Sequence, residues 1–127
     1  MAIEKPKILI VDDEAPLRNA LYDKFVREGF EVCVAKNGIE GLKMVSEKSP
    51  SLILLDIIMP VMDGLSMLQK LRKMKHGKKI PVIILTNLSD TAKIAEAIKH
   101  GTYDYLVKSN WKLTEVVDKV RETLGKK

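Results

Sequence analysis

Short apolar runs alternate with longer amphipathic segments along the chain, and this alternation limits the fold more than any other feature of the sequence. The short runs are rich in Ile, Leu and Val, and most are continuously apolar, as strands covered on both faces are. They lie at Lys7–Val11, Glu31–Ala35, Leu52–Leu55, Val82–Leu85 and Tyr103–Val107. Runs of this kind predict strands in the interior of a sheet.

Amphipathic segments separate these strands and follow the last one. In the first segment, Leu17, Leu21 and Phe25 recur at every fourth position and share one helical face. Pro16 near its start and Gly29 after its end are usual boundary signals of a helix. The other helices are expected at about Ile39–Lys48, Leu65–Lys75, Thr91–His100 and Leu113–Leu124.

Strict alternation of strand and helix predicts an α/β fold, a parallel sheet with helices on both faces. Right-handed crossovers leave few doubly wound strand orders, and we expect the five-stranded, flavodoxin-like order 2-1-3-4-5. The 127 residues fit a single domain with a core from about residue 7 to residue 124. In such a sheet the ligand site lies beyond the carboxyl ends of the first and third strands.

Composition excludes several classes of protein. The chain is 46% hydrophobic and 31% charged, as globular domains are. No apolar stretch approaches a membrane span, and the first residues lack the apolar run of a signal peptide, so we expect a cytoplasmic protein without membrane contact. The single cysteine, Cys33, lies in an apolar run and is predicted to be a core residue.

The formal net charge of +5 raises the question of nucleic-acid binding. The basic excess lies at Lys70, Arg72, Lys73, Lys75, Lys78 and Lys79. Apolar residues recur through this stretch at helical spacing and no aromatic residue interleaves with it, so we interpret it as a solvated helix face and loop. No helix-turn-helix or zinc pattern supports a nucleic-acid partner.

Polar residues stand where the predicted strands end. They are Asp12 and Asp13, followed by Glu14, after the first strand, Asp56 after the third, Thr86 after the fourth and Lys108 after the fifth. Because the carboxyl ends of parallel strands share one edge of a sheet, we expect these side chains to converge there. The alternative for the acidic residues after the first strand is that they only cap the next helix.

Such a set of side chains suits phosphoryl transfer. Clustered carboxylates attract a hard cation, and Mg²⁺ takes a few carboxylates while keeping positions for water or phosphate oxygens. A carboxylate beside the cation can act as a nucleophile toward a phosphoryl group, and Asp56 is the candidate. Lys108 can neutralise charge on the phosphoryl oxygens, and Thr86 can donate a hydrogen bond to one of them.

These motifs resemble those of the receiver domain of response regulators in two-component signalling, including the chemotaxis receiver, over nearly the whole chain. Ile8–Glu14 resembles the family's first strand and acidic pair, and Asp56–Gly64 resembles its phosphoacceptor motif. Val82–Thr86 and Gly101–Lys108 resemble its fourth and fifth strands. The resemblance implies a chain that catalyses its own aspartyl phosphorylation and dephosphorylation without being an enzyme in the usual sense.

The resemblance also implies roles for single residues. Asp56 accepts the phosphoryl group from a histidine kinase, a phosphotransfer protein or a small phosphodonor. Asp13, Asp56 and the backbone carbonyl of Ile58 bind Mg²⁺ directly, and Asp12 supports them.

A conformational switch follows from the same resemblance, in which Thr86 moves toward the phosphoryl group and Tyr105 turns inward. The switch biases a surface on the fourth helix, fifth strand and fifth helix toward an unknown downstream protein. We expect a monomer or weak dimer, with no output domain after Leu124. Whether the chain stands alone or is part of a longer regulator stays open.

Two positions depart from the family's pattern. Ser109 replaces the usual proline after Lys108, and we expect a trans bond between them, because a cis bond to a non-proline residue costs roughly 2.5–4 kcal/mol. Trp111 should then pack near the start of the last helix. Asn87 is larger than the usual residue after Thr86, and such a side chain either slows entry of the phosphodonor or adds a hydrogen bond.

The lifetime of the phosphorylated state depends on access of water to the phosphorus atom. Ile58 and Leu88 stand two positions after Asp56 and Thr86, where a polar side chain can orient the attacking water. Both are bulky and apolar, and Asn87 is expected to lie off the line of attack. These residues predict slow self-dephosphorylation.

There are two rival functions, the first of them that of a module with the same fold. One is a protein-interaction module that works without phosphorylation, which the intact strand-end residues Asp13, Asp56, Thr86 and Lys108 argue against. The other is a hydrolase like the haloacid-dehalogenase phosphatases. Those enzymes carry a second aspartate two residues after the nucleophile, where this chain has Ile58.

Overall fold

A parallel sheet runs through the centre of the computed structural model, which describes residues 5–57, 59–86, 91–99, 104–107 and 112–125. Within these residues its strands are β1 (Lys7–Val11), β2 (Glu31–Ala35), β3 (Leu52–Asp56), β4 (Val82–Thr86) and β5 (Asp104–Val107). All neighbouring strands pair in parallel, in the order β2-β1-β3-β4-β5. The strand order predicted from the alternation is confirmed.

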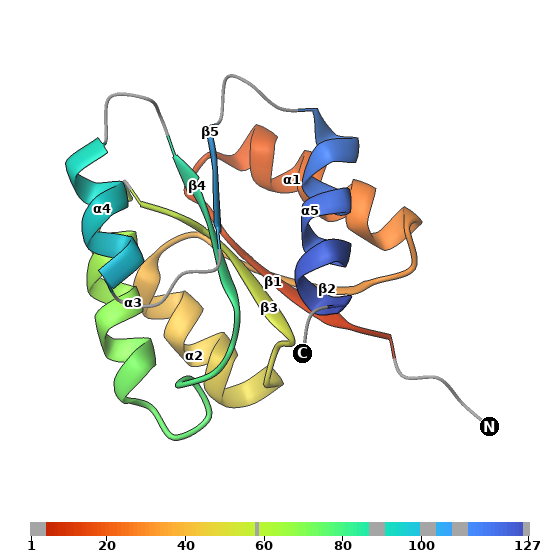
Figure 1. The fold of residues 1–127 in the computed structure, drawn as a ribbon. Helices are drawn as coiled ribbons and strands as arrows, with labels where there is room; N and C mark the ends of the chain where they lie inside the picture. The colour runs from red at the N-terminus through yellow and green to blue at the C-terminus, as the bar shows by residue number, and fades with distance from the viewer. Residues whose placement is uncertain (1–4, 58, 87–90, 100–103, 108–111, 126–127) are drawn as a thin grey trace.

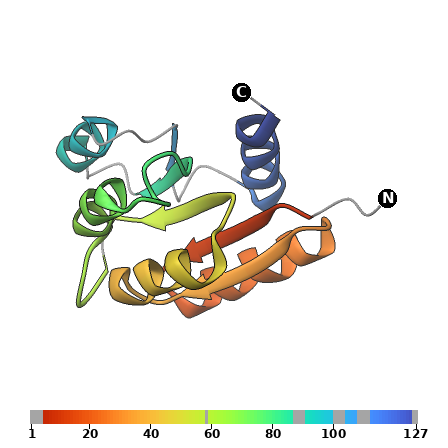
Figure 2. The ribbon, with the colours of Figure 1, turned by 90° about the horizontal axis from the view of Figure 1, so that it is seen from below.

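Helices cover both faces of the sheet, as Figures 1 and 2 show. Helices α1 and α5 lie on one face, and α2, α3 and α4 lie on the other. Their bounds are α1 (Ala15–Arg27), α2 (Gly38–Lys48), α3 (Gly64–Lys73), α4 (Thr91–Lys99) and α5 (Leu113–Gly125). None of these helices has the length and apolar character needed to cross a membrane.

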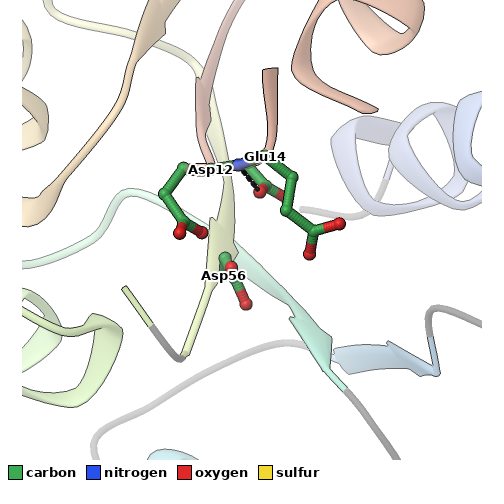
Figure 3. A group of neighbouring side chains, drawn as sticks. Asp12, Glu14 and Asp56 are labelled. Carbon is green, nitrogen blue, oxygen red and sulfur yellow. Dashed lines mark hydrogen bonds between the residues drawn. The ribbon is translucent and has the colours of Figure 1, made fainter. Parts of the chain in front are cut away.

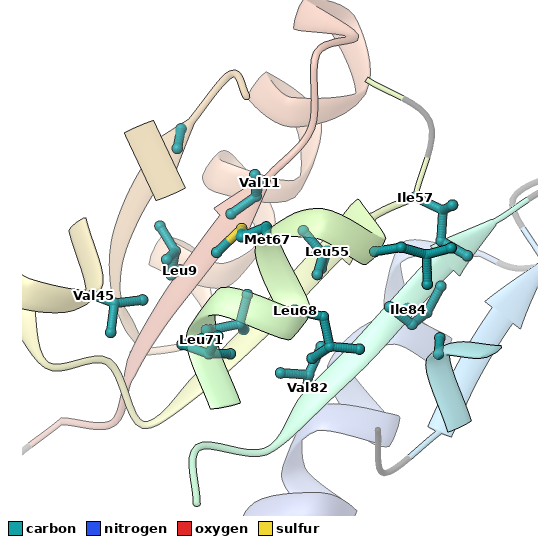
Figure 4. Packing of buried hydrophobic residues seen from close by; sticks show 14 of the residues in the cluster. Leu9, Val11, Val45, Leu55, Ile57, Met67, Leu68, Leu71, Val82 and Ile84 are labelled. Atoms are coloured by element: carbon teal, nitrogen blue, oxygen red, sulfur yellow. The ribbon is translucent and has the colours of Figure 1, made fainter. Parts of the chain in front are cut away.

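The strands divide the core into two apolar clusters, because successive side chains of a strand point to opposite faces. Leu9 and Leu55 belong to the cluster under α2 and α3 (Figure 4), whereas Ile8 and Leu54 belong to the cluster under α1 and α5. Each large apolar side chain that is fully buried contributes about 1.5–3 kcal/mol. Strand β3 is buried along its whole length, so the backbone of Asp56 at its carboxyl end is held rigidly.

Helix α3 ends earlier than its apolar pattern predicted. Its last residue is Lys73, and Met74 has extended backbone angles (φ −81°, ψ 141°). One cause is Arg72, whose Nη1 donates to the carbonyl oxygens of Gly77 and Ile80, both at 2.8 Å. The chain must leave the helix to bring these carbonyls within reach of the guanidinium.

The prediction that the basic segment is a solvated helix face and loop is therefore wrong for Arg72. Its side chain is half-buried, and burial lowers the pKa of its guanidinium. It holds the loop between α3 and β4, whereas Lys70, Lys73 and Lys75 are exposed, as a solvated face requires. Cys33, predicted to be a core residue, is half-buried on the edge strand β2 and packs against the apolar cluster under α2 and α3.

Candidate functional site

Four carboxylates gather beyond the carboxyl ends of β1 and β3, which are neighbours in the sheet. Asp12, Asp13, Glu14 and Asp56 each bring a carboxylate oxygen within 4.8 Å of the others. Figure 3 shows Asp12 and Glu14 from the end of β1 close to Asp56 from the end of β3. The acidic residues that the strand order predicted to meet do meet.

Burial divides this acidic cluster into an inner and an outer pair. Asp12 is fully buried and Asp56 is 4% exposed, whereas Asp13 and Glu14 are exposed. Carboxylates held so close together repel one another, and the repulsion is strongest where water is excluded. A hard divalent cation removes that cost, and carboxylate oxygens are the ligands that Mg²⁺ prefers. The donor set therefore fits the cation expected from the sequence.

The turn between β1 and α1 is held by polar bonds. Oδ1 of Asp12 accepts the backbone N–H of Glu14 at 2.9 Å, and Nη1 of Arg18 donates to the carbonyl oxygen of Asp12 at 2.8 Å. Glu14 is the N-cap residue of α1, yet its side chain makes no capping hydrogen bond. Helix capping thus does not explain the carboxylate of Glu14, which lies in the acidic cluster instead.

The loop between β3 and α3 is held by close backbone contact. The N–H of Gly64 donates to the carbonyl oxygen of Ile57 at 2.7 Å. A Cβ atom at Gly64 would overlap the carbonyl oxygen of Asp56 and lie 2.8 Å from Cα of Ile57. Only glycine permits this approach, so the first residue of α3 fixes the end of β3 and with it Asp56. The side chain of Asp63 caps the helix by accepting the N–H of Ser66 at 2.8 Å.

The same loop also contacts the start of α2. The N–H of Gly38 donates to the carbonyl oxygen of Met62 at 3.1 Å, and a Cβ at Gly38 would lie 2.7 Å from Cγ of Met62. Between these contacts, Val61 has a left-handed backbone (φ 70°) and is 77% exposed. A β-branched residue rarely adopts this conformation, so the loop stores strain at Val61.

The other predicted site residues are described in part. Thr86 ends β4, the neighbour of β3, and Tyr105 lies within β5, so their backbones stand where the fold predicted them. The expectations for Ile58, Asn87, Leu88, Lys108, Ser109 and Trp111 fall outside the described residues. Their roles stay predictions, as does the geometry of the Lys108–Ser109 bond.

Comparison with known proteins decides the family. The family model described as "Response regulator receiver domain" matches residues 8–121. The chain belongs to this family. The prediction from the strand-end motifs is therefore confirmed, and the chain is a response regulator receiver.

Curated relatives of this receiver include transcriptional regulators. "Probable transcriptional regulator ycf27" of Pyropia yezoensis is 40% identical over 108 residues, which cover 85% of this chain and 43% of that protein. The transcriptional regulatory protein PrrA of Mycobacterium bovis is 35% identical over 125 residues, covering 98% and 52%. The receiver thus spans about half the length of these relatives.

Solved structures agree. A CheY-like receiver domain protein of Methanospirillum hungatei has a TM-score of 0.88 and 26% identity, covering 95% of this chain and 94% of that one. The receiver domain of the Francisella response regulator 1452 has a TM-score of 0.84 and 33% identity, covering 94% and 97%. This chain thus shares the flavodoxin-like receiver fold with both of these solved structures.

Sequence reasoning missed two contributors to this site. Convergence of the strand-end residues predicted Glu14 near Asp12 and Asp13, whereas no pattern pointed to Arg18, and Gly64 was predicted only as part of the phosphoacceptor motif. The contacts of Arg18 and Gly64 depend on distances between residues that are not adjacent in sequence, and no spacing rule reports them.

Proposed function

We propose that this receiver is a phosphorylation switch in which Asp56 accepts a phosphoryl group beside a bound Mg²⁺ ion, within a domain core of about residues 7–124. One observation carries the proposal: the carboxylate of Asp56, 4% exposed at the end of a buried strand, lies within 4.8 Å of three other carboxylates. A nucleophile must be held in a fixed position for in-line attack, and β3 and the close contact of Gly64 hold the backbone of Asp56. Family membership supports the same role.

The cation would be held by Asp13, Asp56 and the backbone carbonyl of Ile58, with Asp12 in support. When bound, it offsets negative charge on the transferred phosphoryl group. A carboxylate oxygen of Asp56 attacks phosphorus in line, and the bond between phosphorus and the donor's leaving atom breaks. The product is an acyl phosphate on Asp56.

Two further groups complete the proposal. The Lys108 ammonium would pair with phosphoryl oxygens, and the Thr86 hydroxyl would donate a hydrogen bond to one of them. Movement of Thr86 would let Tyr105 turn inward and change the surface of α4, β5 and α5. The strand order supports this arrangement, because β4 and β5 end at the same edge as β3.

Partners follow from the chemistry. The phosphoryl group would come from a histidine kinase or a phosphotransfer protein, and the altered surface would bind a downstream protein. The relatives named above are transcriptional regulators about twice as long as this chain, which makes a DNA-binding protein or segment one class of downstream target.

The test is phosphorylation by acetyl phosphate in Mg²⁺ buffer. The intact mass of the wild type should rise by one phosphoryl group, Asp56→Asn should show no gain, and the matched control Asp23→Asn on the exposed face of α1 should label fully. Asp13→Asn should weaken Mg²⁺ binding, because a carboxylate ligand becomes a neutral amide. Equal labelling of Asp56→Asn would refute the assignment.

The same preparation tests two related expectations. Loss of label after removal of the donor measures the slow dephosphorylation predicted from Ile58 and Leu88, and Ile58→Asn combined with Leu88→Glu should speed it. Titration with beryllofluoride separates the switch from a phosphorylation-independent module. A switch should bind this acyl-phosphate mimic in a manner that requires Asp56, and an interaction module should not respond.

A further inference from the structure

The loop between α3 and β4, residues 74–81, presents lysines that have no acidic partner, and we call it the basic loop. The sequence from residue 64 to residue 86 contains no Asp or Glu. Elsewhere, lysines such as Lys24 and Lys43 pair with a glutamate four residues later. No ion pair joins the exposed lysines of the basic loop to a carboxylate of the described residues. These lysines are Lys75, Lys78 and Lys79.

The backbone of the basic loop is held from the inside by Arg72. Its Nη1 donates to the carbonyl oxygens of Gly77 and Ile80 at 2.8 Å, and to that of Lys78 at 3.3 Å. A Cβ atom at Gly77 would overlap the carbonyl oxygen of Leu71, so the loop packs directly on the end of α3. The carbonyl groups thus face the guanidinium while the lysine side chains are exposed. A loop that is already ordered loses less freedom when it binds a partner.

The basic loop and the acidic cluster lie at opposite ends of the sheet. The loop leads into Val82, the first residue of β4, which pairs in register with Ile53 near the start of β3. The acidic cluster lies beyond the carboxyl ends of β1 and β3. Figure 1 shows the loop, drawn in green, at the bottom of the view, away from the carboxyl ends of β3 and β4. A partner at the basic loop therefore leaves the surroundings of Asp56 open.

The composition of the basic loop fits a partner that is held by charge alone. None of the large apolar side chains that are exposed in the described residues lies in this loop. Protein interfaces have an apolar centre and are depleted in lysine, and binding to a membrane surface depends on apolar side chains that insert. Single-stranded nucleic acids need aromatic residues for stacking, and the loop has none. Double-stranded nucleic acid needs neither, because its phosphates carry dense and regular negative charge.

We propose that the basic loop binds the phosphate backbone of double-stranded nucleic acid. The contact is independent of base sequence, because lysines meet phosphates as point charges and such contacts carry no sequence information. The proposal assigns a nucleic-acid contact to the receiver's own surface. It does not depend on phosphorylation of Asp56, so it can fail while the proposed function holds, and the reverse is also true.

The experiment measures the fluorescence anisotropy of a labelled DNA duplex of random sequence, titrated with the whole chain over a series of salt concentrations. The variant that combines Lys75→Gln, Lys78→Gln and Lys79→Gln should lose at least about tenfold in affinity at low salt. The slope of log affinity against log salt concentration should also become shallower, by about 0.9 for each phosphate contact that is lost.

The matched control combines Lys36→Gln, Lys43→Gln and Lys112→Gln, which remove the same charge from exposed positions elsewhere. It should keep most of the affinity and the slope of the wild type. Equal losses in the two triple variants would overturn the proposal, because net charge and not the basic loop would then attract the duplex.

Parallel titrations test the other polyanions. Vesicles of phosphatidylglycerol and phosphatidylcholine in equal parts replace the duplex in one series, and poly-glutamate replaces it in another. The duplex should bind more tightly than either. Binding of the vesicles or of poly-glutamate as tight as that of the duplex would overturn the proposal, and so would a wild type that does not bind the duplex at low salt.

Discussion

The turn after β1 is held by hydrogen bonds of charged and polar groups, whereas the loop after β3 is held by the close approach of bare backbone. In the turn, Arg18 donates to the carbonyl oxygen of Asp12, and the carboxylate of Asp12 accepts the backbone N–H of Glu14. In the loop, Gly64 and Gly38 lie where any side chain would meet a neighbour. The two halves of one site should therefore respond differently to mutation, salt and cations.

The largest effect is expected at Gly64. Gly64→Ala would place a methyl group on the carbonyl oxygen of Asp56, a backbone atom that cannot turn aside. We expect a loss of about 3 kcal/mol in the free energy of unfolding, measured by urea denaturation. Labelling by acetyl phosphate should slow at least about tenfold, because the nucleophile is displaced.

Gly125→Ala is the matched control, since nothing lies within 4 Å of a Cβ atom at this helical glycine. It should leave stability unchanged or raise it slightly, as alanine favours helix. Equal effects of the two substitutions would show that helix propensity, and not contact with Asp56, governs Gly64.

A smaller, cation-dependent effect is expected at Arg18. Arg18→Met removes the hydrogen bond to the carbonyl oxygen of Asp12 and a positive charge beside the acidic cluster. We expect a loss of about 1 kcal/mol without divalent cations, and a smaller loss in saturating Mg²⁺, which replaces the missing charge.

Thermal unfolding with and without MgCl₂ measures both values for Arg18→Met. Arg27→Met at the exposed end of α1 is the control, and its effect should not depend on Mg²⁺. If Mg²⁺ rescued Gly64→Ala as well as Arg18→Met, the distinction between a polar turn and a packed loop would be wrong.

The smallest effect, a gain, is expected at Val61. Val61→Asn relieves a left-handed β-branched residue, and asparagine tolerates this conformation. Because the side chain is 77% exposed, little packing is lost, and stability should rise by about 0.5–1 kcal/mol in urea denaturation. Val26→Asn on helix α1 should lower stability instead, because this side chain is only 46% exposed and apolar contact is lost. No gain at Val61 would mean that the loop is not strained there.

Much of this protein could be derived from its sequence by itself. The alternation of apolar runs and amphipathic segments predicted the strand order, because parallel crossovers allow few arrangements. That order placed Asp12, Asp13 and Asp56 at one sheet edge, and the carboxylate cluster in the structure agrees. These inferences succeeded because they depend on local periodicity and on a topological rule, neither of which needs distances.

Only the tertiary structure decided how the site is held. The hydrogen bond from Arg18 to the carbonyl oxygen of Asp12 joins residues six positions apart, and the inward turn of Arg72 depends on carbonyls five to eight residues away. The contact of Gly64 with Asp56 and the strained backbone of Val61 depend on how a loop closes between two fixed ends. Sequence patterns report which face a residue occupies, whereas contacts at atomic distance follow from the packing of the whole chain.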